Sequence, residues 1–408
     1  MNIVVLQDYL RSGGTERQSL LLTQAFAAAG HRTTLLTFRP GGALNGPSAG
    51  VERRALQPFD TSFDWLAPGL VRTARALAPD VLLCMGRMAN CYGGRLQARL
   101  PRTAVIATMR TGKALPWLFR RSLRRVRHIV ANCREAKATL IAQHGLPAER
   151  ISVIYNSLVF PPAARNGSAS ASAAKREIVP LPAREVLRAQ FGANPGTTVL
   201  LCVAMFRPEK NQRALIEIAA GLPADLDWQL WLAGDGSERA ACERLAAECR
   251  AGSLALSLPN GPAVSRPAVS LSNRSNRPNP ATAPIKFLGW QRDPTPLYTA
   301  ADIAVHASGS ESLSNFLIEA QAHGLPAVAY HAQGIAECFV PGDTGFVIPR
   351  DDPAAFRARL ATLAREDPAT RQARSVRAQA YARTTFDRSR QVVAYLELFS
   401  KLVLASTP

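Results

Sequence analysis

Short apolar runs alternate with longer helical patterns along this chain, and the alternation occurs in two blocks. In the first block, six runs rich in Val, Ile, Leu and Thr begin with NIVVLQ (2–7) and end with ISVIYN (151–156). The alternation resumes at TTVLLCVAMF (197–206) and continues to GFVIP (345–349). Strands that alternate with helices form parallel βαβ units. The sequence therefore predicts an α/β protein with two doubly wound, Rossmann-like domains.

The segments between and after these blocks have a different composition. Residues 159–195 include a stretch rich in Pro, Ala and Ser that cannot form a core, so we expect a linker and a lead-in segment there. The second block is interrupted at 251–284 by many Ser, Pro and Asn residues, which predict an inserted flexible loop. The expected domains are therefore 1–158 and 196–385, followed by an amphipathic helix within 386–408 whose apolar face needs a partner surface.

The net charge of +19 is concentrated in the first domain, where residues 1–160 hold 22 Lys and Arg against 8 Asp and Glu. Such a field attracts nucleic acid, anionic lipid or an anionic substrate, and charge alone does not choose among them. Aromatic residues make up only 7% of the chain and we find no nucleic-acid-binding motif. A basic nucleic-acid-binding protein therefore remains an alternative, but we expect no nucleic-acid partner.

The cysteines and the hydropathy pattern bear on location. The seven cysteines are odd in number and contain no Cys-x-x-Cys pair, which is typical of reduced thiols. No apolar run approaches the ~20 residues that a transmembrane helix needs, and the first residues lack the pattern of a secretory leader. We therefore expect a cytoplasmic protein.

Two glutamates, Glu311 and Glu319, flank an apolar segment that predicts a buried helix beginning near Ser314. Carboxylates that hydrolyse glycosides lie ~5–9 Å apart, whereas eight residues of helix span ~12 Å, so a hydrolytic pair is not expected. The free amides around 313–315 form an anion site at the helix start. A nucleoside diphosphate sugar suits this arrangement, because its phosphates would bind the amides and its hydroxyls would donate to the glutamates.

Two further motifs follow strands and support an anion site. Arg207 and Lys210, in FRPEKN, come after a strand of the second domain, and the carboxyl ends of such strands face the ligand crevice. Their charges would clamp a diphosphate. Gly13 and Gly14 follow the first strand, where the missing side chains would let the backbone approach a phosphate or a sugar.

Six motifs in order resemble the family 4 retaining glycosyltransferases, which have the GT-B fold. The resemblance covers nearly all of the chain apart from the linker and the inserted loop. The motifs are SGGTERQ (12–18), FRPEKN (206–211), WLAGDGSER (231–239), FLGWQRD (287–293), ESLSNFLIEAQAHGLPAVAY (311–330) and GDTGFVIP (342–349).

The resemblance implies a GT-B protein, with two Rossmann-like domains facing a central cleft, and a role for each matching residue. It places the acceptor in the first domain and the nucleotide sugar in the second, with the helix from Asp387 crossing back to the first domain. Arg207 and Lys210 would bind the donor diphosphate, Glu311 the donor sugar and Glu319 the ribose. The amides of the loop would hold phosphate and sugar, and the glycine loop would close over the donor; these residues are Leu313, Ser314, Asn315, Gly13 and Gly14.

The chain departs from the family pattern at two places. Ser312 follows the first glutamate, where many members have Gly. Near the strand TAVIATM, where many members have a His, this chain reads TMRTGK, so Arg110 is a candidate for the same role. The histidines closest to the motifs, which are His306, His323 and His331, are expected to be structural.

The implied reaction moves a hexose from a nucleoside diphosphate sugar to an acceptor hydroxyl with retention of configuration, in glycolipid, lipopolysaccharide or other envelope polysaccharide synthesis. Glu311, Arg207 and Lys210 are the expected catalytic residues, since stabilising the departing charge is usually the largest contribution. We expect no metal and no cofactor besides the sugar donor. The DLD sequence at 225–227 precedes a strand, which is the wrong end for a ligand of the crevice.

A basic and aromatic segment, KALPWLFRRSLRRVRHIV (113–130), suits the surface of an anionic membrane. Its ordinary alternative is a solvated basic helix with one face against the core. We expect peripheral binding at the inner face of the cytoplasmic membrane, on the acceptor side, by Trp117, Arg120, Arg121 and Arg124, with Arg110 nearby.

A nucleotide-sugar epimerase with the same two-domain architecture is the alternative from another enzyme class. It would act on the donor without an acceptor, so incubation with the donor alone distinguishes the two activities.

Overall fold

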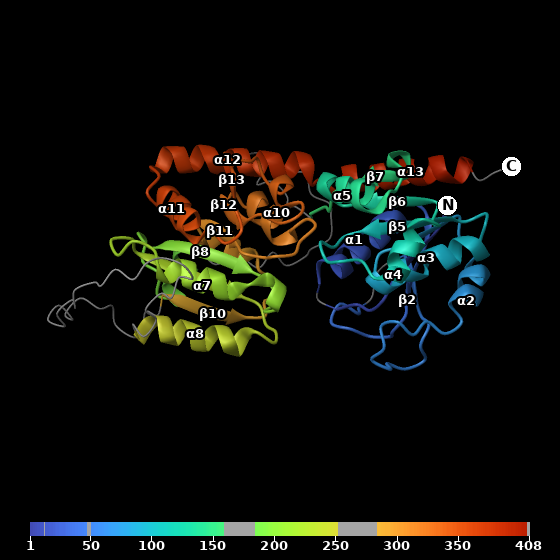
Figure 1. The fold of residues 1–408 in the computed structure, drawn as a ribbon, viewed down its shortest axis with the longest axis horizontal. Helices are drawn as coiled ribbons and strands as arrows, with labels where there is room; N and C mark the ends of the chain where they lie inside the picture. The colour runs from blue at the N-terminus through green and yellow to red at the C-terminus, as the bar shows by residue number, and fades with distance from the viewer. Residues whose placement is uncertain (12, 47–49, 159–183, 252–283, 406–408) are drawn as a thin grey trace, which may run out of the picture.

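The protein consists of two α/β domains that lie side by side and are joined along one edge by the last helices of the chain (Figure 1). This computed structural model describes residues 1–11, 13–46, 50–158, 184–251 and 284–405. Residues 159–183 of the predicted linker and 252–283 of the predicted loop lie outside these ranges.

The N-terminal domain is built on a seven-stranded sheet in which every pairing is parallel, in the order β3-β2-β1-β4-β5-β6-β7. The central strands are almost continuously buried, as expected where helices cover both faces of a parallel sheet. The strands are β1 (Asn2–Gln7), β2 (Arg32–Thr37), β3 (Val51–Ala55), β4 (Val81–Cys84), β5 (Ala104–Met109), β6 (His128–Ala131) and β7 (Ile151–Val153).

The edge strand β3 was not predicted, because its sequence, VERRA, has no apolar run. It lies at the border of the sheet and is partly exposed, so it needs only backbone pairing with β2. The helices of this domain are α1 (Gly14–Ala28), α2 (Leu70–Leu77), α3 (Arg87–Arg99), α4 (Trp117–Leu123) and α5 (Arg134–His144), with a short 3-10 helix η1 (Ala148–Arg150).

The C-terminal domain repeats this architecture with a six-stranded parallel sheet in the order β10-β9-β8-β11-β12-β13. Its strands are β8 (Thr198–Val203), β9 (Trp228–Ala233), β10 (Ile285–Gly289), β11 (Ile303–His306), β12 (Ala327–Tyr330) and β13 (Gly345–Ile348). Its helices are α6 (Arg184–Gln190), α7 (Gln212–Ala220), α8 (Arg239–Ala251), α9 (Thr295–Ala300), α10 (Asn315–Ala322), α11 (Pro353–Ala364) and α12 (Pro368–Thr385), with the 3-10 helices η2 (Pro208–Lys210) and η4 (Ile335–Glu337). The predicted α/β class with two Rossmann-like domains is confirmed.

Helix α6 lies within 159–195, which we expected to be a linker and a lead-in segment. The helix belongs to the second domain, because the buried Arg188 donates to the Asp302 carboxylate at 3.0 Å and to the Ala300 carbonyl at 3.0 Å. These contacts join segments more than a hundred residues apart, which is why the composition of the stretch did not reveal them.

The last helix, α13 (Arg388–Leu404), leaves the second domain and packs on the first (Figure 1). Its buried Tyr395 and Phe399 rings lie 6.0 and 5.4 Å from the ring of Phe26 in α1. The chain enters this helix beside the end of the first domain, where the Leu158 amide donates to the Phe386 carbonyl at 3.0 Å. The apolar face noted in the sequence therefore completes the core of the N-terminal domain.

Candidate functional site

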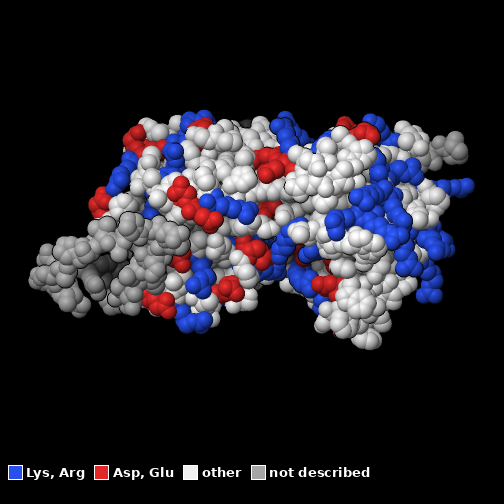
Figure 2. All heavy atoms as spheres, viewed as in Figure 1, with Lys and Arg blue, Asp and Glu red and all other residues white. Residues whose placement is uncertain are grey.

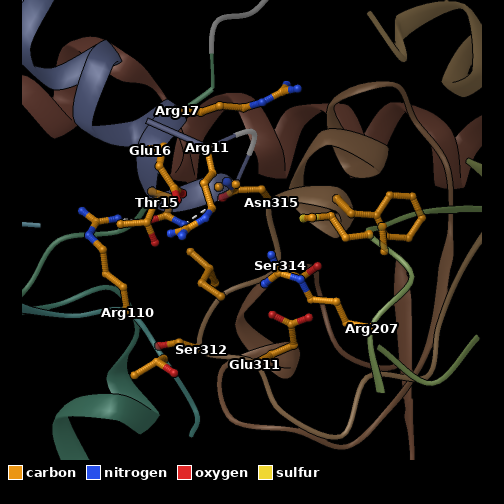
Figure 3. A pocket seen from close by; sticks show the side chains of 18 of the residues that line it. Arg11, Thr15, Glu16, Arg17, Arg110, Arg207, Glu311, Ser312, Ser314 and Asn315 are labelled. Carbon is orange, nitrogen blue, oxygen red and sulfur yellow. Dashed lines mark hydrogen bonds between the residues drawn. The ribbon is translucent and has the colours of Figure 1, made fainter. Parts of the chain in front are cut away.

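A cleft of about 1070 Å³ separates the two domains and is lined by both of them. The residues that follow β1, β4, β5 and β6 line one wall, and those that follow β8, β9 and β11 line the other. Carboxyl ends of parallel strands are where open α/β sheets bind ligands. Figure 3 shows Arg11, Thr15 and Glu16 on one side of this cleft, and Arg207, Ser314 and Glu311 on the other.

Glu311 lies at the centre of a charged cluster on the C-terminal wall. Its Oε1 accepts hydrogen bonds from Lys210 Nζ and from His306 Nε2, the latter at 2.9 Å. Burial by itself would raise the pKa of Glu311, but the Lys210 charge and the two hydrogen bonds outweigh burial and lower the pKa to about 2. Glu311 is therefore a fixed, ionised carboxylate in the cleft.

Glu319 also lines the cleft, from inside α10. Its Oε2 accepts a hydrogen bond from the Tyr298 hydroxyl at 2.6 Å. Burial raises the pKa of this carboxyl, although the bond from Tyr298 and the charge of Arg17 act in the opposite direction. The two glutamates thus lie in one cleft but in different electrostatic surroundings.

Helix α10 begins between Glu311 and Glu319 in the sequence. Ser314 is the N-cap, and its hydroxyl accepts from the Leu317 amide. Leu313, Ser314 and Asn315 all line the cleft. The first amides of this helix are therefore placed at a cavity where an anion could bind.

The glycine loop of the N-terminal domain approaches this helix from the opposite wall. Gly13 is the N-cap of α1, and a Cβ added at Gly14 would lie 2.5 Å from Asn315 Nδ2. Asn315 Oδ1 also accepts from Asn156 Nδ2 at 2.8 Å. A side chain at position 14 would therefore displace the Asn315 amide.

The cations predicted to bind a diphosphate line the same cleft. Lys210 uses one of its three donors on Glu311, which leaves two for a ligand. Arg207 is exposed, and its guanidinium donates no hydrogen bond to any described residue. Burial by itself would raise the pKa of Glu209, but the hydrogen bond from Lys113 and smaller contributions, the Arg207 charge among them, together outweigh burial and lower the pKa. The Arg207 charge also opposes the burial that raises the pKa of Glu16.

The residues at which the chain departs from the family pattern are Ser312, which connects the two domains, and Arg110, which contacts α13. Ser312 is buried, and its hydroxyl donates to Asn132 Oδ1 of the N-terminal domain. Arg110 lines the cleft and donates to Asn156 Oδ1 and, at 3.0 Å, to the Tyr395 hydroxyl of α13. Both side chains therefore contact parts of the chain that are distant in the sequence.

The remaining residues of the predicted membrane and acceptor side lie on or next to α4, and none of them lines the cleft. Trp117 is 58% exposed, and the Arg121 guanidinium lies 5.2 Å from its ring centroid. Arg120 and Arg124 are also exposed. The structure thus separates Arg110, which lies in the cleft, from the α4 residues on the outer surface.

His306, which the sequence led us to expect as a structural residue, lies within the site itself. It is buried at the end of β11, lines the cleft and contacts Glu311 directly. Its position at a strand end, five residues before Glu311, was the available signal. His323 stacks on Tyr298 with 5.1 Å between ring centroids, and the side chain of His331 is exposed.

Asp8, on the N-terminal wall of the cleft, is a further lining residue that the sequence did not single out. Its carboxylate accepts from the amides of Met88 and Ala89, at 2.9 and 2.7 Å, at the start of α3. Burial raises the pKa of Asp8 to about 6, against the lowering effect of these two hydrogen bonds.

No cluster of three or more His, Cys, Asp or Glu side chains in the described ranges is arranged to hold a metal ion. Among the helices described, none is long and apolar enough to cross a membrane.

Two family models match this chain, one in each domain. The model for Glycosyltransferase Family 4 matches residues 12–158, and the model for Glycosyl transferases group 1 matches residues 263–366.

Curated proteins with similar sequences include two glycosyltransferases. The lipopolysaccharide core biosynthesis glycosyltransferase LpsE of Rhizobium meliloti is 28% identical over 221 residues, which cover 54% of each chain. The D-inositol 3-phosphate glycosyltransferase of Pseudarthrobacter chlorophenolicus is 26% identical over 263 residues, which cover 62% of this chain and 51% of that protein. The chain thus spans about half the length of the curated relatives it matches.

Solved structures agree over almost the whole chain. Anabaena HepE in complex with UDP-glucose superposes with a TM-score of 0.72 at 22% identity, covering 98% of this chain and 99% of that one. WaaG, a glycosyltransferase involved in lipopolysaccharide biosynthesis, superposes with a TM-score of 0.67 at 17% identity, covering 96% and 98%. These similarities establish the fold. The N-terminal domain thus matches the family 4 glycosyltransferases, the C-terminal domain matches the group 1 glycosyl transferases, and the whole chain has the GT-B fold.

Proposed function

We propose that this protein transfers a hexose from a nucleoside diphosphate sugar to an acceptor hydroxyl, with retention of anomeric configuration, in the synthesis of lipopolysaccharide or a related envelope glycan. The observation that carries the proposal is the arrangement of Arg207, Lys210 and the start of α10 around one cleft beside an ionised Glu311. The relatives named for lipopolysaccharide core biosynthesis support the acceptor class.

The charges in the cleft suit the departure of a nucleoside diphosphate. Negative charge develops on the leaving diphosphate, and preorganised donors and cations in a water-poor site stabilise it strongly. Arg207 has an unengaged guanidinium fork, Lys210 has two free donors, and the α10 amides add the positive end of a helix dipole. This reaction needs no resident metal, because the cations of the chain balance the diphosphate charge.

The two glutamates would bind hydroxyl groups rather than act as nucleophiles. Glu311 is already held by Lys210 and His306, and its low pKa keeps it ionised, so it can accept a hydrogen bond from a sugar hydroxyl. Glu319, beside Tyr298, would accept from the ribose. Retention would then follow from attack by the acceptor on the face that the diphosphate leaves.

The test begins with thermal-shift measurements on a panel of nucleoside diphosphate sugars, since a ligand that binds the native state raises the melting temperature. The bound donor is then assayed for transfer, and the Arg207→Ala, Lys210→Ala double variant is expected to lose turnover while it remains folded. Near-normal turnover in that variant would refute the assignment. Proton NMR of the product reports the anomeric configuration, and an unchanged rate in EDTA is expected.

We also propose that the protein is cytoplasmic and that α4 attaches it to an anionic membrane surface, where a lipid-linked acceptor would be presented. Figure 2 shows Lys and Arg side chains gathered on the visible face of the N-terminal domain. Exposed Trp117 and Leu118 accompany exposed Arg120, Arg121 and Arg124, a combination that favours the interface of anionic lipids. Sedimentation with phosphatidylglycerol and with phosphatidylcholine vesicles tests this attachment, and equal binding to both would contradict it.

A further inference from the structure

Residues 57–66 form a loop between β3 and α2 that displays three exposed aromatic side chains. Phe59, Phe63 and Trp65 are 68%, 52% and 55% exposed, and the rings of Phe63 and Trp65 lie 5.6 Å apart. Exposed aromatic groups that gather in one place commonly mark a binding surface.

The loop is held in place by an almost fully buried arginine. Arg39 is 7% exposed, donates to both carboxylate oxygens of Asp60 at 2.7 and 2.9 Å, and donates to Asp64 at 2.7 Å. Its guanidinium also lies 3.9 Å from the ring centroid of Tyr9. A planar guanidinium that binds two carboxylates and stacks on a ring fixes the loop at two points.

Backbone contacts fix the loop further. Gln57 Nε2 donates to the carbonyls of Phe63 and Leu66, at 3.0 and 2.7 Å, and the Tyr92 hydroxyl donates to the Trp65 carbonyl at 2.7 Å. Ser62 has a φ of 64°, a conformation that is unfavourable for a residue other than glycine. Strain of this kind persists only where the surroundings impose it, and it is common at binding sites.

The aromatic loop continues directly into the cleft. Asp64 and Trp65 line the cleft together with Tyr9 and Arg11. Arg11 donates to Asp64 at 2.8 Å and lies 5.3 Å from the Tyr9 ring centroid, so this wall carries an arginine and carboxylate pair as well as aromatic residues. This wall is formed by the N-terminal domain, opposite the cations and glutamates that we assign to the donor.

We propose that the loop 57–66 is a saccharide platform for the acceptor, in which the Trp65 ring packs against a pyranose ring and Asp64 and Arg11 bind its hydroxyls. The C–H groups of a pyranose carry small positive charges that suit the negative face of an aromatic ring. The Phe63 ring, 5.6 Å from the Trp65 ring, enlarges the aromatic surface, so the platform takes an oligosaccharide rather than a single sugar. This inference rests on the proposed glycosyltransferase function and names the acceptor class for the same cleft.

The charge of the loop distinguishes this occupant from a lipid surface. Residues 56–70 contain Asp60 and Asp64 and no Lys or Arg. The loop thus offers an anionic membrane no basic side chain of its own, whereas α4 presents exposed aromatic and basic groups together. We therefore assign lipid contact to α4 and saccharide contact to the loop.

The experiment measures binding of the full-length protein to an array of oligosaccharides from bacterial envelopes, followed by calorimetric titration of the one that binds best. Trp65→Ala is expected to weaken binding by roughly tenfold or more, as for exposed aromatic anchors in other interfaces, and Trp65→Phe is expected to keep most of it. Val376→Ala is the matched control, because Val376 is also 55% exposed but lies on α12 of the other domain. The thermal shift caused by the sugar donor should be the same in all variants.

Three results would overturn the proposal. They are a wild-type protein that binds no oligosaccharide on the array, a Trp65→Ala variant that binds like wild type, and a Trp65→Ala variant that loses binding to phosphatidylglycerol vesicles while oligosaccharide binding is unchanged. Failure of the proposed function is distinguishable, because in that case no nucleoside diphosphate sugar shifts the melting temperature of the wild type.

Discussion

Replacement of Lys210 by Met is expected to destabilise the C-terminal domain by about 3 kcal/mol at pH 7. The carboxyl of Glu311 has a pKa of about 2 in place of its ordinary 4.5, chiefly because the Lys210 charge overcomes the cost of burial. At about 1.4 kcal/mol for each pH unit, this difference corresponds to about 3 kcal/mol. The value agrees with the 3–5 kcal/mol that is typically lost when one partner of a buried ion pair is removed.

The lowered pKa of Glu311 also predicts how the loss of stability depends on pH. Because the pKa of Glu311 is lower in the folded protein, its contribution to stability is complete above pH 4.5 and is lost as the pH falls through about 2. The difference in stability between wild type and Lys210→Met should therefore be largest near neutral pH and should shrink below pH 4.5.

Thermal denaturation followed by circular dichroism between pH 3 and pH 7 measures this difference. A loss of about 3 kcal/mol lowers the melting temperature of a domain of this size by roughly 6–12 °C. The matched control is Arg365→Met, which breaks an exposed ion pair with Asp225 in the same domain and should cost less than about 1 kcal/mol. The double variant Lys210→Met, Glu311→Gln should recover part of the loss, because it removes the buried charge that has no partner.

Equal melting temperatures of Lys210→Met and Arg365→Met at pH 7 would refute this prediction. A difference between Lys210→Met and wild type that stayed constant from pH 7 to pH 3 would also refute it.

Three more outcomes follow from the described contacts. Burial raises the pKa of the Cys202 thiol to about 12, so this thiol should resist iodoacetamide at pH 8, whereas the half-buried Cys249 should react first. Equal labelling of the two cysteines in peptide mass spectrometry would contradict this. The Asp8 carboxyl should titrate near pH 6 in carbon NMR spectra. Because its pKa is raised in the folded protein, its contribution to stability is complete below pH 3.8 and is lost as the pH rises through about 6. Glu337→Ala removes the acceptor for the Arg134 and Glu135 amides and for the Tyr155 hydroxyl, which join the two domains. The expected result is a larger radius of gyration in small-angle X-ray scattering than for Glu337→Gln, and identical values for the two variants would argue against this role.

Periodicity alone was sufficient for the fold class, because buried parallel strands must be apolar and must alternate with helices. The order of the motifs likewise identified four cleft residues. Arg207, Lys210 and Glu311 come in the loops after strands of one sheet, and Glu319 lies in the helix that follows. These features are local in the chain, so they can be recognised from the amino-acid sequence alone.

Only the tertiary structure decided which groups meet. His306 became a partner of Glu311 because the turn after β11 brings the two side chains together, and Ser312 meets Asn132 although 180 positions separate them in the chain. Arg39 fixes the aromatic loop through Asp60 and Asp64, and nothing in the sequence of that loop reveals its anchor. The burial and the charge of a side chain depend on neighbours supplied by distant segments, so they arise only when the chain has folded.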